Sequence, residues 1–553
     1  MQTSTDILIV GAGPTGLALA IDLARRGVGY RIVDRAAGPS TASRAKTIQP
    51  RALEVADDLG VIDRVLELGR VHVPTRHYDR DRVISEAVEA ALGVRDPGVP
   101  YPPVWLSQPL FEQILRDRLA ELGGRVEWGA EVTAVAQTAD AVEVTVSTTT
   151  GDRRMRALYV VGCDGGRSVV RERIGATLAG VSYGDHRWWL GDVRIEGLDN
   201  RCQHVWMSPE HGILSLFPLP STDVWQFQAS IPADDPDPAA PTLDLFRRLF
   251  AEHSGLGEVR IEDAGWLSLY RINVCLADRY RVGRVFLAGD AAHIHSPAGG
   301  QGMNTGIQDA YNLGWKLAAV LDGADESLLD TYELERRAVA RAVLDDSTDR
   351  MHALMRSAGN GDGASAVRRL TDNFTTGLTV AYPDSPLTGP GPRTGRVRAG
   401  DRAPDAVGIE ASSGREVRVF DLLRGPHWTL LTFDQGNAPG QADARGTAAT
   451  RTIRITTDTA ATGADTLIDG DGSVHRNYDI TGDTAVLIRP DGYIAAVFRD
   501  EPTIAGGRPR SADIGEDVRP GVENEDSTRS AYGEDDSANQ PAFGTFHRPP
   551  NRR

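Results

Sequence analysis

The sequence predicts an α/β protein of more than one domain, and this prediction depends mainly on three apolar runs. The runs at 7–10, 158–163 and 285–288 have the length and composition of buried strands. Each run ends in a glycine-rich turn, and each turn leads into a helical pattern. At 553 residues the chain is too long for one ordinary core, so we expect two or three domains.

The composition is that of a globular protein, with 41% hydrophobic and 25% charged residues. The net charge of −17 argues against a nucleic acid or an anionic membrane as a partner. We find no leader or membrane-spanning pattern and therefore expect a cytoplasmic protein. Neither the three cysteines (Cys163, Cys202 and Cys275) nor the pair His293 and His295 has a metal-ligand spacing, so we expect no metal.

Residues 7–34 read as strand, GxGxxG, helix, strand and acid, which is the order of a Rossmann-like dinucleotide fold. Gly11 permits the tight turn, and Gly13 lets the backbone approach a pyrophosphate. Gly16 lets helix and strand pack closely, and Asp34 can accept hydrogen bonds from ribose hydroxyls. The glycines alone would suit any tight turn, and the motif does not separate NAD from FAD.

The nucleotide-binding pattern is interrupted and later resumed, so we expect a discontinuous domain. The polar, proline-rich segment 72–103 reads as an insertion, and the strand ending at Asp164-Gly165-Gly166 reads as a return to the fold. Residues 181–280 instead alternate apolar and polar side chains in short stretches, which is typical of a β-sheet exposed on one face.

Three motifs in this order resemble those of the flavoprotein aromatic hydroxylases, the family of p-hydroxybenzoate hydroxylase and phenol hydroxylase. They are the GxGxxG, the CDGGRS at 163–168 and the GRVFLAGDAAHIHSPAGGQGMN at 283–304, and the resemblance covers about residues 5–340. It implies bound FAD, with NADPH or NADH as a transient co-substrate and O2. It also implies a monooxygenase that hydroxylates an aromatic or polycyclic polyketide-like substrate through a flavin C4a-hydroperoxide.

The resemblance implies how the domains and partners are arranged. The FAD domain would comprise residues 1–75 with 104–180 and 281–385, and a mixed β-sheet substrate domain would comprise 76–103 with 181–280. We expect a small aromatic molecule as the partner of a monomer or homodimer.

The family's cofactor roles fall on fourteen residues: Gly11, Gly13, Gly16, Asp34, Arg35, Arg44, Gln108, Asp164, Gly289, Asp290, Pro297, Gly302, Met303 and Asn304. By the resemblance, Arg44 contacts the pyrophosphate region, and Gln108 and Asp290 lie on the ribityl side. Asp164 would serve both FAD and NAD(P)H. Pro297 and the backbone of residues 302–304 would lie beside the isoalloxazine ring.

No catalytic residue can be assigned from the resemblance. The aspartate that acts as a base in phenol hydroxylase falls at Lys46 here, so that base is not inherited. This departure argues against simple phenols and favours a polycyclic polyketide or a similar natural product.

Aromatic residues in the 181–280 segment are candidates for the substrate cavity: Trp189, Trp206, Trp225, Phe227 and Tyr270. Aromatic side chains at alternate strand positions are more often core than ligand contacts, so this alternative stays open for each of them.

The C-terminal third resembles the thioredoxin-like domain of phenol hydroxylase and its polyketide-hydroxylating relatives. After a linker at 382–395 rich in Pro and Gly, strand-like runs follow within 394–505. This region contains no cysteine, which excludes thiol redox chemistry and favours a role in packing or oligomer contacts. The composition of residues 506–553 cannot form a core and predicts disorder.

Two alternatives to biosynthetic hydroxylation remain at this point. The same chemistry would serve an enzyme that inactivates an antibiotic such as a rifamycin or a tetracycline. A protein of another class, a flavin-binding subunit without turnover, would carry the same cofactor motifs.

Overall fold

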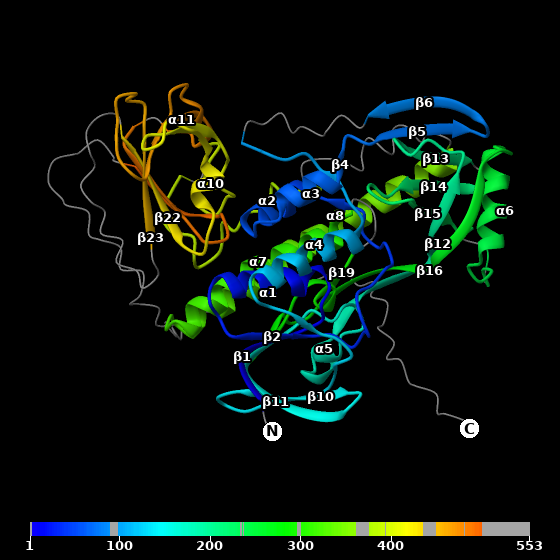
Figure 1. The fold of residues 1–553 in the computed structure, drawn as a ribbon, viewed down its shortest axis with the longest axis horizontal. Coiled ribbons are helices and arrows are strands. Elements are labelled where there is room, and N and C mark those ends of the chain that lie inside the picture. Colours follow the sequence, from blue (N-terminus) through cyan, green and yellow to red (C-terminus); the bar gives the residue numbers. More distant parts are fainter. Residues whose placement is uncertain are drawn as a thin grey trace, which may run out of the picture. The chain divides into compact units, whose positions relative to one another are not determined.

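The computed structural model describes residues 3–88, 98–208, 210–232, 235, 237–295, 300–360, 375–392, 394–434, 450–480 and 482–499. These residues belong to one compact unit, Met1–Gly506. They form a mixed α/β structure with three large β-sheets (Figure 1). None of the described helices combines the length and the apolar character needed to cross a bilayer.

The first sheet contains the three predicted strands, and the order of its main path is β17-β18-β11-β1-β2-β8. Its strands are β1 (Thr3–Val10), β2 (Tyr30–Val33), β8 (Val126–Glu127), β9 (Glu131–Gln137), β10 (Val142–Thr148), β11 (Gly151–Gly162), β17 (Arg281–Val282) and β18 (Val285–Leu287). Strand β11 is parallel to β1 and β18, and Val10, Gly162 and Leu287 lie in register at their carboxyl ends. The three glycine-rich loops therefore leave the sheet at one edge.

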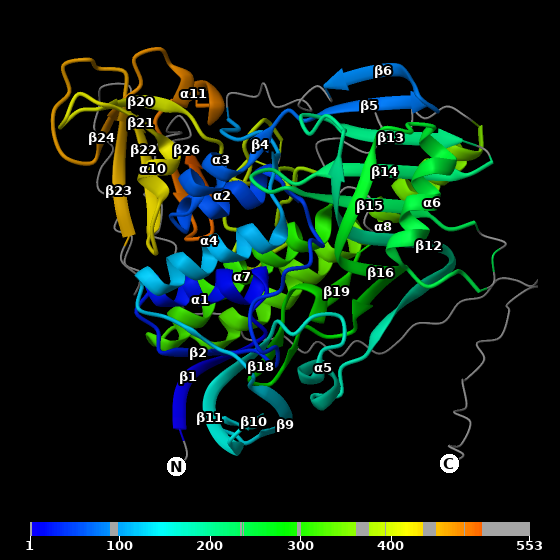
Figure 2. The same ribbon diagram turned by 45° about the vertical axis from the view of Figure 1, so that its right-hand side comes forward.

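Helices pack on this sheet and on one another. They are α1 (Pro14–Arg25), α2 (Pro50–Asp58), α3 (Ile62–Leu68), α4 (Gln108–Glu121), α5 (Val169–Arg173), α7 (Gln301–Leu321) and α8 (Asp330–Asn360), with 3-10 turns η1 (Gly289–Ala291) and η2 (Glu326–Leu329). Helix α1 packs against α4 and α7 (Figure 2). Helices α1 and α7 approach closely because Gly314 faces Asp22, whose Oδ2 would lie 2.3 Å from a Cβ there.

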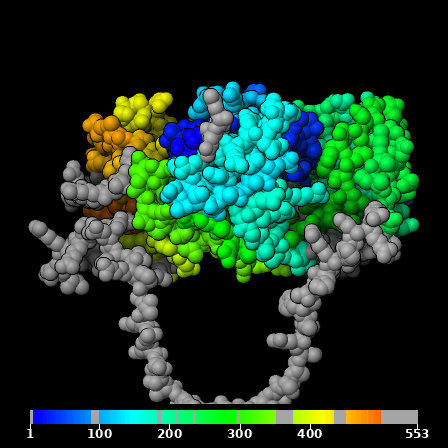
Figure 3. Space-filling view, turned by 90° about the horizontal axis from the view of Figure 1, so that it is seen from below, coloured from blue at the N-terminus to red at the C-terminus, as the bar shows by residue number. Residues whose placement is uncertain are grey.

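The second sheet has the order β19-β16-β12-β15-β14-β13-β5-β6. Its strands are β5 (Pro74–Asp79), β6 (Arg82–Val88), β12 (Leu178–Glu196), β13 (Gln203–Ser208), β14 (Gly212–Pro218), β15 (Val224–Ser230), β16 (Arg260–Ala277) and β19 (His293–Ile294). Helix α6 (Leu243–Ser254) covers one face. Figure 3 shows the green surface of this sheet region beside the cyan surface of the β9–β11 ribbon.

A small sheet and a third large sheet complete the structure. The small sheet joins β3 (Thr47–Ile48), β7 (Val104–Trp105) and β4 (Arg70–Val71). The third sheet, in the order β21-β20-β24-β23-β22-β25-β26, consists of β20 (Val407–Glu410), β21 (Glu416–Arg418), β22 (Trp428–Asp434), β23 (Thr450–Thr456), β24 (Thr466–Ile468), β25 (Thr484–Ile488) and β26 (Ile494–Arg499). It has its own core and two short helices, α10 (Val419–Leu423) and α11 (Ser473–Asn477).

A buried ionic network joins the third sheet to helices α7 and α8. The carboxylate of Glu335 accepts hydrogen bonds from Lys316 at 2.7 Å and from Arg489 at 2.6 and 3.0 Å. Arg489 also pairs with Asp491 in the turn between β25 and β26, at 2.6 Å. Burial alone would raise the pKa of Glu335, but the charges of Arg489 and Lys316 hold it well below the ordinary value of 4.5.

We expect Glu335→Gln to lower the free energy of unfolding by about 3–5 kcal/mol, because it leaves buried Lys316 without its carboxylate and Arg489 with Asp491 alone. The ionised Glu335 stabilises the fold above pH 4.5, and its contribution falls as the pH drops below that value toward the native pKa. The gap between the two proteins in urea unfolding should therefore be wide at pH 7 and narrower at pH 3.5.

Glu67→Gln is the matched control, since it removes a carboxylate from an exposed pair with Arg64 and should barely move the unfolding midpoint. Equal stability of the Glu335→Gln protein and the unsubstituted protein at pH 7 would contradict the structural role of the network.

Candidate functional site

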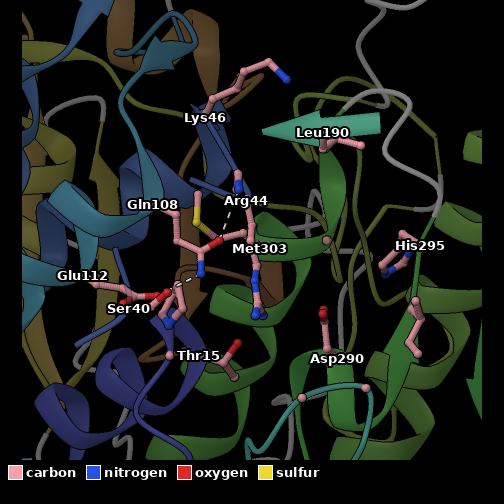
Figure 4. A pocket seen from close by; sticks show the side chains of 18 of the residues that line it. Thr15, Ser40, Arg44, Lys46, Gln108, Glu112, Leu190, Asp290, His295 and Met303 are labelled. Carbon is pink, nitrogen blue, oxygen red and sulfur yellow. Dashed lines mark hydrogen bonds between the residues drawn. The ribbon is translucent and has the colours of Figure 1, made fainter. Parts of the chain in front are cut away.

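The loops after β1, β11 and β18 open into one cavity of about 1010 Å³ that extends to the second sheet. Ligand pockets commonly measure about 300–1,000 Å³, so this cavity has room for a large ligand or for two ligands together. Residues of the first sheet's loops line one part, and residues of the second sheet line the other. Figure 4 shows side chains from both parts.

The first glycine loop fits a nucleotide because it is open on the cavity side. Gly13 lines the cavity, and a Cβ built there would have no atom within 4 Å. Gly11 has a φ of +104° and also lines the cavity. The carboxylate of Asp34 accepts from the backbone N–H groups of Ala12 and Ala36, both at 2.8 Å, which fixes the acid beside the loop. Arg35 follows it in the lining.

Segment 43–46 is held from both sides of the cavity. Asp192 of β12 accepts hydrogen bonds from the backbone N–H of Ser43, at 2.6 Å, and from its hydroxyl. On the other side, Gln108 at the start of α4 accepts from the backbone N–H of Ala45 at 3.2 Å. This anchoring places Arg44 in the cavity wall, where its side chain extends toward the part that contains Asp290 (Figure 4).

The loop after β11 brings Asp164 into the lining, but its carboxylate mainly serves its own helix. It accepts from the Ser168 hydroxyl at 2.5 Å and from the Val170 N–H at 3.1 Å, at the start of α5. Burial raises the pKa of Asp164, while these hydrogen bonds oppose the rise. Gly165 next to it has a φ of +80° and leaves open space on the cavity side.

The loop after β18 and the start of α7 form the wall on the other side. Helix α7 begins at Gln301, and Gly302 and Met303 line the cavity, so its first N–H groups and its positive dipole end face this space. Asp290 also lines the cavity, and burial raises its pKa while His293 and Arg44 oppose the rise. Pro297 lies outside the described residues.

Three of the predicted cofactor residues, Gly16, Gly289 and Asn304, do not line the cavity. A Cβ at Gly16 would lie 2.0 Å from the Gly11 carbonyl oxygen, so Gly16 serves helix–loop packing. Gly289 donates its N–H to buried Asp309 at 3.0 Å. Asn304 connects the start of α7 to segment 47–49, because it accepts from the Gln49 N–H at 2.8 Å and donates to the Thr47 carbonyl at 3.1 Å.

Asp309 is a buried positioning residue behind the cavity that the sequence reasoning missed. Its carboxylate accepts hydrogen bonds from His293 at 2.5 Å and from Arg336 at 2.7 Å, in addition to Gly289. Burial alone would raise the pKa of Asp309, but the charges of His293 and Arg336 lower it to about 2. The sequence signal that could have identified it is an aspartate on the apolar side of the predicted helix, because a buried carboxylate needs hydrogen-bond partners.

The second sheet shows an alternation between a cavity face and a core face, which is interrupted in β16, where the adjacent residues Tyr270 and Arg271 both line the cavity. Its cavity face combines apolar and aromatic side chains with several polar ones and consists of Thr75, Trp188, Leu190, Gln203, Val205, Met207, Ile213, Ser215, Phe217, Gln228, Trp266, Ser268, Tyr270, Arg271 and Asn273. Tyr270 lines the cavity, and burial, followed by the charge of Asp290, raises its pKa to about 12.

The other four predicted substrate residues are corrected. Trp189, Trp206, Trp225 and Phe227 lie in a hydrophobic core on the opposite face, together with residues of α6. Successive side chains of a strand point to opposite faces, so each of the four alternates with a cavity residue in its own strand. Trp188 and Trp266 are the tryptophans that line the cavity on this sheet.

Comparisons with known proteins agree with this geometry. A family model described as FAD binding domain matches residues 4–347, and one described as aromatic-ring hydroxylase, C-terminal, matches residues 396–512. The chain is 42% identical over 506 residues to a flavin-dependent monooxygenase of Mycobacteroides abscessus, covering 90% of this chain and 98% of that protein.

Two further relatives carry more specific names. The 6-methylpretetramide 4-monooxygenase of Streptomyces rimosus is 35% identical over 514 residues, which is 89% of this chain and 90% of that protein. A rifampicin monooxygenase of Rhodococcus hoagii is 32% identical over 495 residues, or 89% of this chain and 95% of that protein. Among solved structures, a ternary complex of aklavinone-11 hydroxylase with FAD and aklavinone has a TM-score of 0.72 at 27% identity, covering 90% and 96% of the two chains.

Substitutions in the first glycine loop should separate cofactor binding from folding. Gly13 has φ −75° and ψ −177°, so alanine fits the backbone, and its methyl group would point into the cavity. We expect Gly13→Ala to leave the thermal unfolding of the apoprotein unchanged and to weaken FAD binding by about tenfold or more. Titration of the apoprotein with FAD, followed by flavin fluorescence, measures this.

Gly16→Ala is the contrasting variant, since its methyl group would overlap the Gly11 carbonyl and destabilise the apoprotein itself by about 1–3 kcal/mol. Unchanged FAD affinity in Gly13→Ala would contradict the placement of the cofactor against this loop.

Proposed function

Because this chain belongs to the family of FAD-dependent aromatic-ring monooxygenases, we propose that it hydroxylates a polycyclic aromatic substrate of the polyketide type. When bound, FAD that has been reduced by NADPH or NADH and has reacted with O2 supplies the oxygen atom that enters the substrate. The observation that carries the proposal is the cavity face of the second sheet, which is broad, presents apolar and aromatic side chains and continues directly from the flavin part of the cavity.

The shape of this face favours flat rings over a small phenol. Trp188, Phe217 and Trp266 supply aromatic surface, on which fused rings stack well. Gln228 and Ser268 supply hydrogen-bonding groups within that surface, and such groups fix a ligand's orientation. The relatives named for 6-methylpretetramide and for aklavinone support the same substrate class.

The chain's own residues would bind the cofactor, orient the substrate and exclude water. We assign FAD contacts to the lining residues Gly11, Gly13, Asp34, Arg35, Arg44, Gln108, Asp164, Asp290, Gly302 and Met303, and to Pro297. The N-terminus of α7 would stabilise negative charge on the reduced flavin, since its N–H groups face the cavity. The neutral hydroxyl of Tyr270 would donate a hydrogen bond within the same space.

We further propose the following organisation of the chain. Residues 1–75, 104–180 and 281–385 form the FAD domain, and 76–103 with 181–280 form the substrate domain. Residues 394–505 form a thioredoxin-like domain with a packing role, which the contact of Arg489 with Glu335 supports. The protein acts in the cytoplasm, as a monomer or homodimer, on a small molecule alone.

Antibiotic inactivation is the second candidate, because a rifampicin monooxygenase is among the relatives. The two functions predict different substrates for the same oxygen transfer. The mass of the product and the residual antibacterial activity of a treated rifamycin separate them.

The proposed activity is tested by NADPH and NADH oxidation with a panel of aromatic polyketides of two to four fused rings. We expect a matching substrate to accelerate NAD(P)H oxidation by about tenfold or more, because aromatic substrates fill the cavity face beside the flavin. Oxygen uptake should match a product that is heavier by one oxygen atom, with little peroxide released.

Absence of stimulation by every ring system in the panel would contradict the proposed substrate class. Oxygen uptake that ends only in hydrogen peroxide, with unaltered substrate, would contradict hydroxylation.

A further inference from the structure

The chain contains two lysines, and among the residues that the structure describes one of them, Lys316, has a counter-ion. Lys316 is buried and donates to Glu335 at 2.7 Å and to Asn312 at 2.8 Å. Lys46 lines the cavity, and no ion pair or hydrogen bond from its ammonium group is found among the residues that the structure describes. Lys46 is half-buried on the wall of the cavity, so an anionic group of a ligand in the cavity can reach its unpartnered ammonium group.

The surroundings of Lys46 are apolar and belong to the substrate part of the cavity. Its Nζ lies 4.0 Å from the centre of the Phe217 ring on β14, and that ring is 5.8 Å from Trp105 on β7. Strand β7 also fixes the backbone, because Leu106 donates its N–H to the Lys46 carbonyl at 3.0 Å. Figure 4 shows Lys46 and Arg44 extending to different sides, with Arg44 directed toward Asp290 and Lys46 away from it.

No neighbouring charge compensates Lys46 within the described chain. Strands β7 and β14, which pack against it, carry no titratable side chain. The acids that line the cavity, Asp34, Glu112, Glu131, Asp164 and Asp290, all come from the first sheet, its loops and its helices. The other titratable groups in the lining are Arg35, Arg44, His72, Cys163, Arg167, Tyr270, Arg271 and His295.

We propose that Lys46 binds an ionised hydroxyl of the substrate, a phenolate or an enolate, and thereby holds the substrate in its electron-rich form. The proposal rests on the proposed function, since it names the feature that the substrate presents to the cavity. Hydroxylation of an aromatic ring proceeds at electron-rich carbons, so stabilising the anion beside the flavin favours the reaction. Arg44 serves the cofactor side, and Lys46 serves the substrate side.

The proton balance follows from the state of Lys46 in the free protein. Burial lowers the pKa of Lys46 to about 8, so the free side chain is an ammonium at pH 6.5 and mostly an amine at pH 9. At pH 6.5, the substrate O–H bond breaks on binding and the proton goes to solvent. At pH 9, the same O–H bond breaks and the proton forms a new N–H bond on Lys46, so none is released. Both routes end in an ammonium–oxyanion pair.

The test uses the oxidised, FAD-loaded protein without NADPH and the three-ring phenol 1-hydroxyanthraquinone as the probe. Visible absorption reports whether the bound phenol is ionised, and a pH indicator in weak buffer counts released protons. The unsubstituted protein should release one proton per probe bound at pH 6.5 and close to none at pH 9. The bound phenol should be ionised already at pH 6.5, more than about three pH units below the pH at which it ionises in Lys46→Met.

Three variants make the result specific. Lys46→Met should bind the phenol in its protonated form and release no proton at either pH. Lys46→Arg keeps the charge but cannot accept a proton, so it should release one proton at both pH values. Arg82→Met removes an exposed cation of β6, which pairs only with Asp79 in the described structure, and should behave like the unsubstituted protein.

Unchanged ionisation and proton release in Lys46→Met would overturn the proposal and leave the proposed function standing. Failure of the unsubstituted protein to bind the probe, together with failure of the whole polyketide panel, would overturn the substrate class and the role of Lys46 with it. If Lys46→Met does not retain FAD, the Lys46→Arg protein still tests the proposal. Equal proton release by Lys46→Arg and by the unsubstituted protein at pH 9 would exclude proton transfer to Lys46 and overturn the proposal.

Discussion

The buried carboxylate of Asp309 is the interaction on which the flavin side of the cavity depends. It accepts from the N–H of Gly289, from His293 and from Arg336, so it joins α7, the loop after β18 and α8 at one point. Arg336 in turn donates to the Tyr382 hydroxyl at 2.9 Å. A buried charge is tolerated only when its partners compensate for the lost water, and here three donors do so. The loop and the helix start can therefore face the same space.

A second constraint joins the cofactor part of the cavity to the substrate part. Segment 43–46 is hydrogen-bonded to Asp192 and Gln226 of the second sheet and to Gln108 of α4. In a regular strand, the side chains of residues two apart point to the same face. Segment 43–46 is not a regular strand, so the side chains of Arg44 and Lys46 can point to different sides of the cavity (Figure 4). One short stretch thus supplies a cation to each part of the cavity.

The sequence was sufficient for features that are encoded locally and insufficient for those that depend on distant partners. The strand–turn–helix order around Gly11, Asp164 and Asp290 is local, and the structure places all three in one cavity. A period of two in a strand predicts that neighbours differ in face, but it does not say which face is buried. Trp206 therefore falls in the core and Trp266 in the cavity, although both lie in alternating strands.

The partners of Asp309 and Glu335 are separated from them by up to 154 residues, so no local pattern predicts them. The hydrogen bonds of these two carboxylates also connect the third sheet to the wall of the cavity. Glu335 and Arg336 are adjacent on α8, yet Glu335 binds Arg489 of the third sheet while Arg336 binds Asp309 beside the flavin loop. One turn of α8 is therefore fixed from both directions. Packing of the third sheet holds this turn in place, and the turn holds the wall of the cavity.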